Sequence, residues 1–339
     1  MPPEARVQRV GITGASGRLG TLLLQQLGGS AAPLVLPNEV SGDAASASAA
    51  GADGDDSHGG GRGRPVTVLV PFTYNVGDYV PWAGSVGATT ADTIFSGAVS
   101  LAEEAEAIAA FAAAAPSSSA EPTARLIREP CELDLGDAGA VSGAFAGLDV
   151  VIHLAATVHA DASWDTVSRN NIDATHNVMD ECVRSGVRRL VFASSNHTQA
   201  GDLFTSLDPL AEDGLCALRP GASALDLGMS PACDGYYALS KLLGEEMCKY
   251  FACRHGLETI CLRIGWFKGG HLPDPVAQLE ELAELASGPA QDYMRAMWLS
   301  RTDALQIFRA ACMTTALPTS WPQSATGPWA VAYAGTVRW

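Results

Sequence analysis

The chain has 339 residues, 47% of them hydrophobic, and 37 acidic against 21 basic side chains give a net charge of −16. This length and apolar content are sufficient for a full α/β core. The acidic balance argues against a nucleic-acid-binding surface. The N-terminus shows no secretory signal and no run of 18 apolar residues predicts a membrane span, so we expect a cytoplasmic protein.

A strand, a glycine turn and a helix open the chain in the order that a dinucleotide site requires. An apolar strand at 9–13 leads into GASGRLG at 14–20, and apolar helical sequence follows at 21–27. The first glycine permits the tight turn, the second lets the backbone approach a pyrophosphate, and the third allows close helix packing. The phosphates would bind free N–H groups at the helix N-terminus. The cofactor-binding residues expected here are Gly14, Ser16, Gly17, Arg18, Leu19 and Gly20.

Segments rich in small and polar residues interrupt this pattern. Residues 41–64 are of low complexity, and residues 83–120 are rich in Ala and Ser, with helix propensity at 100–114. We expect both to be insertions that are disordered or loosely ordered. Residues 203–232 and 266–300 are expected to form substrate-side segments. The remainder predicts one NAD(P)-binding, Rossmann-type domain over residues 5–339.

Strands and helices alternate along the rest of the chain. A helix is expected at 168–185 and another around Tyr237. The alternation predicts an α/β fold with a doubly wound parallel sheet covered on both faces. The strand at 149–154 ends in Ala155 and Ala156, small residues where a cofactor can approach the backbone. The expected strands lie at 125–127, 149–154, 189–193 and 258–264.

Tyr237 and Lys241 carry the candidate chemistry. They lie four residues apart, so on a helix they project from the same face. A Lys beside a Tyr favours the tyrosinate form of a phenol whose usual pKa is about 10. Such a phenol can move a proton to or from a sugar hydroxyl. By itself the spacing is also compatible with a surface Lys and a half-buried Tyr. Ser195 ends a predicted strand at the edge where parallel sheets place ligands.

The order of the motifs resembles the extended short-chain dehydrogenase/reductase family, also called the NAD-dependent epimerase/dehydratase family. The resemblance covers nearly the whole chain apart from the insertions. It implies Ser195, Tyr237 and Lys241 as catalytic residues, with Asn171 in support. The matching motifs are TGASGRLG at 13–20, DLGD at 134–137, HLAA at 153–156, NIDAT at 171–175, SSNH at 194–197, YALSK at 237–241 and LRIG at 262–265. The further cofactor contacts that it implies are Asp134 and Leu135 near the adenine, Leu154, Ala155, Ala156, Tyr237, Lys241 and Ile264.

Within that family the chain is similar to uronate dehydrogenases. The SSNH stretch lacks the acidic residues that nucleotide-sugar dehydratases carry after the serine. Two positions depart from the subgroup: Trp266 stands where a serine is usual, and Val158 or His159 stands where another serine is expected. An arginine would bind a sugar carboxylate through two hydrogen bonds. The implied substrate contacts are Ser195, Asn196, His197, Tyr237 and Arg295.

The choice between NAD and NADP rests on which segment forms the second strand. Glu39 lies 19 residues after Gly20 and follows a short expected strand at 33–36, which favours NAD. Residues 66–72 are a stronger strand candidate with no acid at its end. If they form the second strand, Arg62 or Arg64 would meet the 2′-phosphate of NADP. We expect NAD, with NADP as the alternative.

Eight cysteines contain no C-x-x-C pair, so reduced thiols and no metal site are expected. The predicted activity is NAD(P)-dependent oxidation of a free sugar or sugar acid. One alternative is a nucleotide-sugar epimerase or reductase that keeps its coenzyme bound. Another is a non-catalytic NAD(P)-binding regulatory protein. The resemblance also implies a homodimer formed through two helices.

Overall fold

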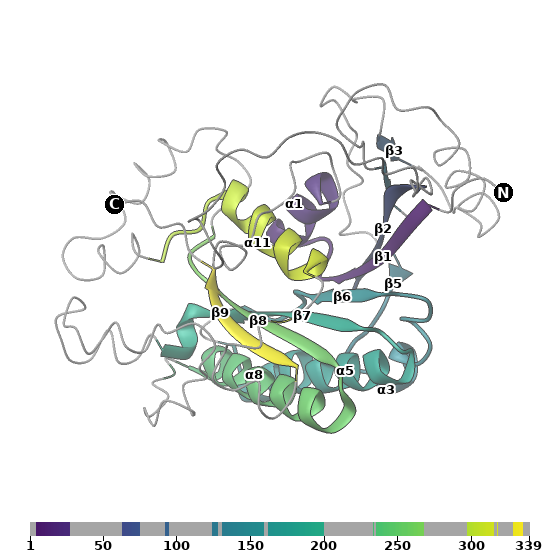
Figure 1. Cartoon of the computed structure of the whole chain (residues 1–339). Helices are drawn as coiled ribbons and strands as arrows, with labels where there is room; N and C mark the ends of the chain where they lie inside the picture. Colours follow the sequence, from purple (N-terminus) through teal and green to yellow (C-terminus); the bar gives the residue numbers. More distant parts are fainter. Residues whose placement is uncertain are drawn as a thin grey trace, which may run out of the picture.

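A computed structural model describes residues 5–27, 63–74, 92–94, 124–127, 131–158, 162–199, 233, 235–267, 297–314, 317 and 328–334. They form a parallel sheet with helices on both faces, which confirms the predicted α/β fold. Figure 1 shows α3 (Ala138–Val141), α5 (Ala174–Arg184) and α8 (Tyr236–His255) along one face of the sheet. Helices α1 (Arg18–Gln26) and α11 (Arg301–Met313) cover the other.

The sheet has nine strands in the described part of the chain, and every strand pair is parallel. Their order is β3-β4-β2-β1-β6-β7-β8-β9, with β5 paired to the end of β2. The chain runs outward from β1 on one side and returns to continue from β6 on the other. This reversal of strand order is the place where open α/β sheets bind ligands. The strands are β1 (Ala5–Thr13), β2 (Gly63–Thr73), β3 (Asp92–Ile94), β4 (Ala124–Ile127), β5 (Cys131–Glu132), β6 (Val150–His153), β7 (Arg189–Ser195), β8 (Glu258–Ile264) and β9 (Trp329–Ala334).

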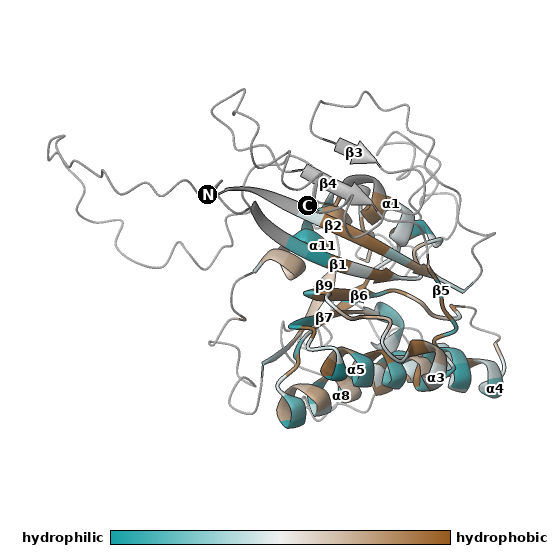
Figure 2. Ribbon diagram, turned by 90° about the vertical axis from the view of Figure 1, so that its right-hand side faces the viewer, coloured by the Kyte–Doolittle hydropathy of each residue, from teal (hydrophilic) through white to brown (hydrophobic). Residues whose placement is uncertain are grey.

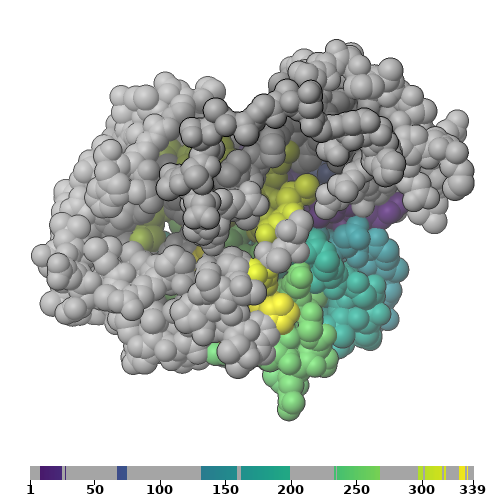
Figure 3. Space-filling model, in the orientation of Figure 1, coloured from purple at the N-terminus to yellow at the C-terminus, as the bar shows by residue number. Residues whose placement is uncertain are grey.

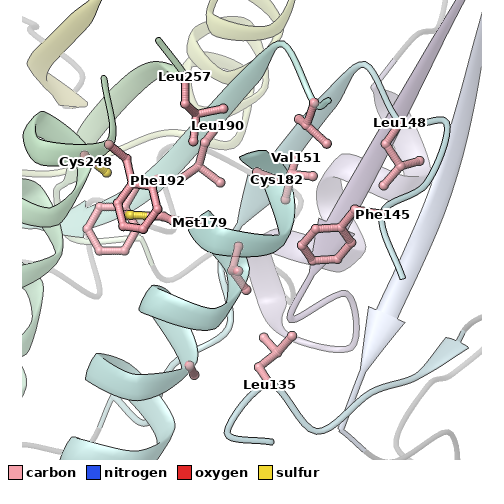
Figure 4. Packing of buried hydrophobic residues seen from close by; sticks show 14 of the residues in the cluster. Leu135, Phe145, Leu148, Val151, Met179, Cys182, Leu190, Phe192, Cys248 and Leu257 are labelled. Carbon is pink, nitrogen blue, oxygen red and sulfur yellow. The ribbon is translucent and has the colours of Figure 1, made fainter. Parts of the chain in front are cut away.

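Two apolar cores lie on the two faces of the sheet. Because side chains alternate along a strand, Val151 packs in one core, whereas Val150 and Ile152 pack in the other. Figure 4 shows Val151 in the first core together with Phe145 and Met179. Figure 2 shows that the central strands are hydrophobic and that hydrophilic residues lie along the helices below them. Because the side chains within the strands are used by these two cores, the residues that can form a binding site are those at and after the strand ends.

Several predicted boundaries are wrong. Strand β2 begins at Gly63, inside the expected insertion at 41–64. Strand β3 (Asp92–Ile94) lies inside the expected insertion at 83–120 and pairs with β4, which follows that insertion. Both short pieces gain backbone hydrogen bonds by extending the parallel sheet. The expected helix at 100–114, the strand at 33–36 and residues 203–232 lie outside the described residues.

The helix predicted at 168–185 is present, but its first part is not a regular α-helix. It consists of a π-helical segment η3 (Ser168–Asp173) and α5, and the short helix α4 (Trp164–Val167) directly precedes it. A π-helical turn contains an extra residue and therefore rotates the side chains that follow it. In the described part of the chain, no helix is both long and apolar enough to cross a membrane.

Candidate active site

A cavity of about 1110 Å³ lies at the carboxyl ends of the central strands. Its wall includes the glycine turn after β1 and the residues that end β2, β6, β7 and β8, together with one side of α8. Small-molecule sites usually measure about 300–1,000 Å³. The cavity therefore offers room for a dinucleotide together with a small substrate.

The glycine turn has the shape of a pyrophosphate cradle. Gly14 has φ +69°, and a Cβ there would lie 2.7 Å from the backbone nitrogen of Ala155. A Cβ on Gly20 would lie 2.4 Å from the carbonyl oxygen of Gly14, so only glycine allows α1 to begin this close to β1. Gly17 caps α1 without a side-chain hydrogen bond. The first N–H groups of α1 lie at the cavity, and these residues fit a dinucleotide phosphate.

The corner beside this turn is formed by the carboxyl end of β2. Thr73 and Tyr74 line the cavity there, and the hydroxyls of Thr73 and Ser16 lie 3.1 Å apart. The strand at 66–72 is thus the neighbour of β1. Arg64 stands near the amino end of β2, about 30 Å along the strand from Thr73, so the expectation that it meets a 2′-phosphate is wrong. Glu39 and Arg62 lie outside the described residues.

Asp134 and Leu135 line the cavity beyond that corner. One carboxylate oxygen of Asp134 accepts from the backbone N–H of Gly136 at 2.9 Å, and the other lies 2.5 Å from the guanidinium of Arg169. The hydrogen bond and charge of Asp134 raise the pKa of Arg169. This ion pair neutralises the carboxylate at the cavity wall.

Lys241 and Tyr237 share one face of α8, as their spacing predicts. The ammonium of Lys241 lies 5.8 Å from the ring centre of Tyr237 and 4.9 Å from that of Phe192, both within cation–π range. Lys241 is buried, and desolvation lowers the pKa of its side chain to about 8. Both side chains line the cavity.

Ser195, Asn196 and His197 meet these two residues from the end of β7. The hydroxyl of Ser195 accepts from the backbone N–H of His197 at 3.2 Å and lies 3.4 Å from the Asn196 carbonyl oxygen. The His197 ring lies edge-on to Tyr237, with 5.9 Å between ring centres. The strand end and the helix therefore place a hydroxyl, an amide, an imidazole and a phenol around one end of the cavity.

Asn171 lies behind this wall, in the π-helical segment. Its amide group donates to the Ser240 hydroxyl at 2.9 Å and to the Thr157 carbonyl at 3.0 Å, and its carbonyl accepts from the Thr157 N–H at 2.7 Å. The Ser240 hydroxyl in turn donates to the carbonyl oxygen of Tyr237 at 2.7 Å. Asn171 thus connects the cavity wall at Thr157 to α8 between Tyr237 and Lys241.

His153 forms a second buried polar connection. Its ring nitrogens lie 2.8 Å from the Thr13 hydroxyl and 3.1 Å from the Thr175 hydroxyl. Burial, with a smaller contribution from the charge of Lys241, lowers the pKa of His153 to about 3. The ring is therefore neutral at physiological pH. HLAA identified this stretch, but the sequence did not indicate a polar connection between β1, β6 and α5.

The structure brings most of the expected site residues together. The glycine-turn residues, Leu154, Ala155, Ala156 and Ile264 line the same cavity, whereas Arg295 and His159 lie outside the described residues. Trp266, Phe267 and Val158 also line it, close to the end of β8 and the loop after β6. Sequence reasoning missed Thr157, Arg169, Phe267 and Tyr74, none of which belongs to a motif. Among the described residues no group of three His, Cys, Asp or Glu side chains is arranged to hold a metal ion.

Comparisons with known proteins agree with this geometry. Residues 95–279 match the model of the NAD dependent epimerase/dehydratase family. An L-arabinose 1-dehydrogenase (NAD(P)(+)) of Haloferax volcanii is 38% identical over 189 residues, 56% of this chain and 69% of that protein. An NAD-dependent glucose-6-phosphate dehydrogenase of the same species is 33% identical over 178 residues, 52% of this chain and 59% of that protein. A uronate dehydrogenase of Pseudomonas putida is 29% identical over 193 residues, 57% of this chain and 59% of that protein. The chain thus covers less than two thirds of the length of the glucose-6-phosphate dehydrogenase and of the uronate dehydrogenase.

Proposed function

The chain belongs to the NAD-dependent epimerase/dehydratase family, and from this premise we propose that it is an NAD(P)-dependent dehydrogenase of a sugar or sugar acid. One observation carries the proposal: a single cavity is lined by the glycine turn and by Ser195, Tyr237 and Lys241. The first can hold the phosphates of a dinucleotide, and the others can move a hydroxyl proton.

Each of the catalytic residues would have a separate role in the reaction. Tyr237 takes the proton of the substrate hydroxyl, and Ser195 orients that oxygen. The positive charge of Lys241 stabilises the phenolate of Tyr237. The bound coenzyme supplies the nicotinamide ring that accepts the hydride from the sugar carbon. Asn171 holds α8 against the cavity wall through Ser240 and Thr157, which keeps Tyr237 in place.

The substrate would occupy the end of the cavity near Asn196 and His197. The relatives act, by their names, on L-arabinose, glucose 6-phosphate and uronates. Trp266 lines the same cavity, and its mostly apolar side chain suits the C–H groups of a neutral aldose better than a carboxylate. Arg295 is our candidate for binding a carboxylate if the substrate is a sugar acid. We expect neutral aldoses to be turned over at least as well as uronates.

Turnover tests the proposal directly. The purified protein is mixed with NAD or NADP and a panel of aldoses, uronic acids and sugar phosphates, and the absorbance of the reduced nicotinamide is followed. We expect a rise with at least one sugar. Absence of turnover with every sugar, together with a coenzyme that copurifies with the protein, would favour the epimerase alternative.

The role of Tyr237 has its own test. Tyr237→Phe should lower kcat about 10²–10⁴-fold, because the acid/base group is lost, while coenzyme still binds. Tyr236→Phe is the matched control, since Tyr236 is the exposed neighbour on the same helix and does not line the cavity. Turnover by Tyr237→Phe at the wild-type rate would show that the catalytic assignment is wrong.

A further inference from the structure

In a dinucleotide site, the residues at the carboxyl ends of β1 and β2 determine whether the adenosine ribose of NAD or that of NADP is bound. An acid at this point bonds the 2′-hydroxyl of NAD, whereas a nearby arginine accommodates the 2′-phosphate of NADP. Thr13 pairs with Phe72, so Thr73 and Tyr74 directly follow the pair that borders the glycine turn. Among the described residues, the carboxyl end of β2 therefore carries a hydroxyl and a phenol and no acid.

An arginine follows Ser16 in the glycine turn and lines the same cavity. Arg18 is the first residue of α1, and its side chain is exposed and lines the cavity. The hydroxyl of Ser16, two residues earlier, lies 3.1 Å from the hydroxyl of Thr73. The guanidinium can donate hydrogen bonds to a phosphate, as can the one hydroxyl of this pair that does not donate to the other, and the planar guanidinium matches phosphate oxygens in pairs.

The carboxylates of the described residues do not neutralise the positive charge of Arg18. Asp134 is the one acid among the described residues that line the cavity, and it is paired with Arg169 at 2.5 Å. Glu132 pairs with Thr73 across β5 and β2, but it does not line the cavity. Arg18 forms no ion pair with another described residue. As far as the described residues go, the positive charge of Arg18 at the start of α1 is therefore available to an anionic group in the cavity.

We propose that this corner binds the 2′-phosphate of NADP(H) through Arg18, assisted by Ser16 and Thr73, and that the protein prefers NADP(H) to NAD(H). The inference rests on the proposed function insofar as both concern the same coenzyme site. The expectation of NAD rests on Glu39, which lies outside the described residues. The preference for NADP(H) rests instead on the residues at the end of β2, the strand that pairs with β1.

Two fragments of the coenzymes test the preference without any sugar. Adenosine 2′,5′-bisphosphate carries the extra phosphate, and 5′-AMP lacks it. Isothermal titration of the full chain should show binding of the bisphosphate about tenfold tighter or more, the factor that one charge-assisted hydrogen bond of about 1.4 kcal/mol supplies. Arg18→Ala should reduce this ratio about tenfold. Arg254→Ala removes an equal charge from the exposed end of α8, outside the cavity, and should keep the ratio.

A second variant reverses the chemistry of the corner. Tyr74 is 69% exposed, so Tyr74→Asp adds a carboxylate there with little cost to folding. It should weaken binding of the bisphosphate several-fold and leave 5′-AMP the tighter ligand. The proposal is overturned if the wild type binds 5′-AMP as tightly as the bisphosphate, or if Arg18→Ala keeps the wild-type ratio. Weaker 5′-AMP binding in Glu39→Gln or Glu132→Gln would then locate an acid at the ribose. Failure of sugar oxidation with the ratio intact would overturn the proposed function alone.

Discussion

Lys241 carries its charge where water hardly reaches it. Its side chain is 4% exposed, and burial lowers its pKa from 10.5 to about 8. In the unfolded chain the lysine keeps its proton to higher pH, close to the ordinary value. Between about pH 8 and 10.5 the unfolded state therefore binds more protons than the folded state, and the free energy of unfolding rises with pH.

This difference predicts a pH-dependent gain in stability that belongs to one residue. Relative to Lys241→Met, the wild type should gain up to about 3 kcal/mol between about pH 8 and 10.5. Lys241→Arg, which stays charged throughout, should also lack the gain. Urea unfolding of the three proteins without coenzyme, at several pH values, measures it. Identical pH dependence in the wild type and Lys241→Met would contradict the lowered pKa.

At the scale of elements, a buried ion pair fastens α8 to two strands. Glu245, one turn beyond Lys241, accepts hydrogen bonds of 2.8 and 2.7 Å from the guanidinium of Arg263 in β8. It also accepts from the hydroxyl of Ser194 in β7 at 2.5 Å. The side chains of Glu245 and Arg263 are fully buried. The helix that carries Tyr237 is thus held against the strand that ends in Ser195.

Breaking this pair should destabilise the fold strongly. Glu245→Gln removes the carboxylate that pairs with the buried guanidinium of Arg263, and breaking a buried pair in this way costs about 3–5 kcal/mol. The control is Asp180→Asn, which removes the exposed ion pair with Arg184 on α5 and should cost about 1 kcal/mol or less. Urea unfolding at neutral pH compares them, and the double variant Glu245→Met, Arg263→Met should recover part of the loss. Equal costs for the two single variants would show that the buried pair has no special role.

The elements that sequence reasoning found are those with a strong local pattern. The glycine turn, the central strands and the Tyr237–Lys241 helix depend on periodicity and on glycine, and both are visible in the residues themselves. The π-helical segment has no such pattern. It places Asn171 between Thr157 and Ser240, and Ser240 lies 69 residues further along the chain. A turn that depends on so distant a partner cannot be predicted from its own residues.

For the whole molecule, the alternation of strands and helices was enough to bring the motifs to one edge of the sheet. The carboxyl ends of parallel strands share that edge, so Ser195 and the glycine turn had to meet there. The identity of the second strand was harder, because it depends on which segment pairs with β1. The cavity walls outside the motifs, such as Arg169 and Phe267, depend on packing across elements and carried no signal in the sequence.

If two copies of the chain form the homodimer that the family resemblance implies, we expect the outer face of α8 to be their interface. Tyr236, Leu243 and Tyr250 recur every seven residues and are exposed, so they form an apolar stripe along the helix. Figure 3 shows part of the segment that contains α8, in green, at the surface. Since family resemblance implies a homodimer through helices, we expect this stripe to pack against its copy. Leu243→Glu should therefore convert a dimer to a monomer in light scattering after size-exclusion chromatography, because a buried unpaired charge is costly. Met313→Glu, at an exposed position on α11, should remain dimeric. A monomeric wild type, or a dimeric Leu243→Glu variant, would exclude the stripe as the interface.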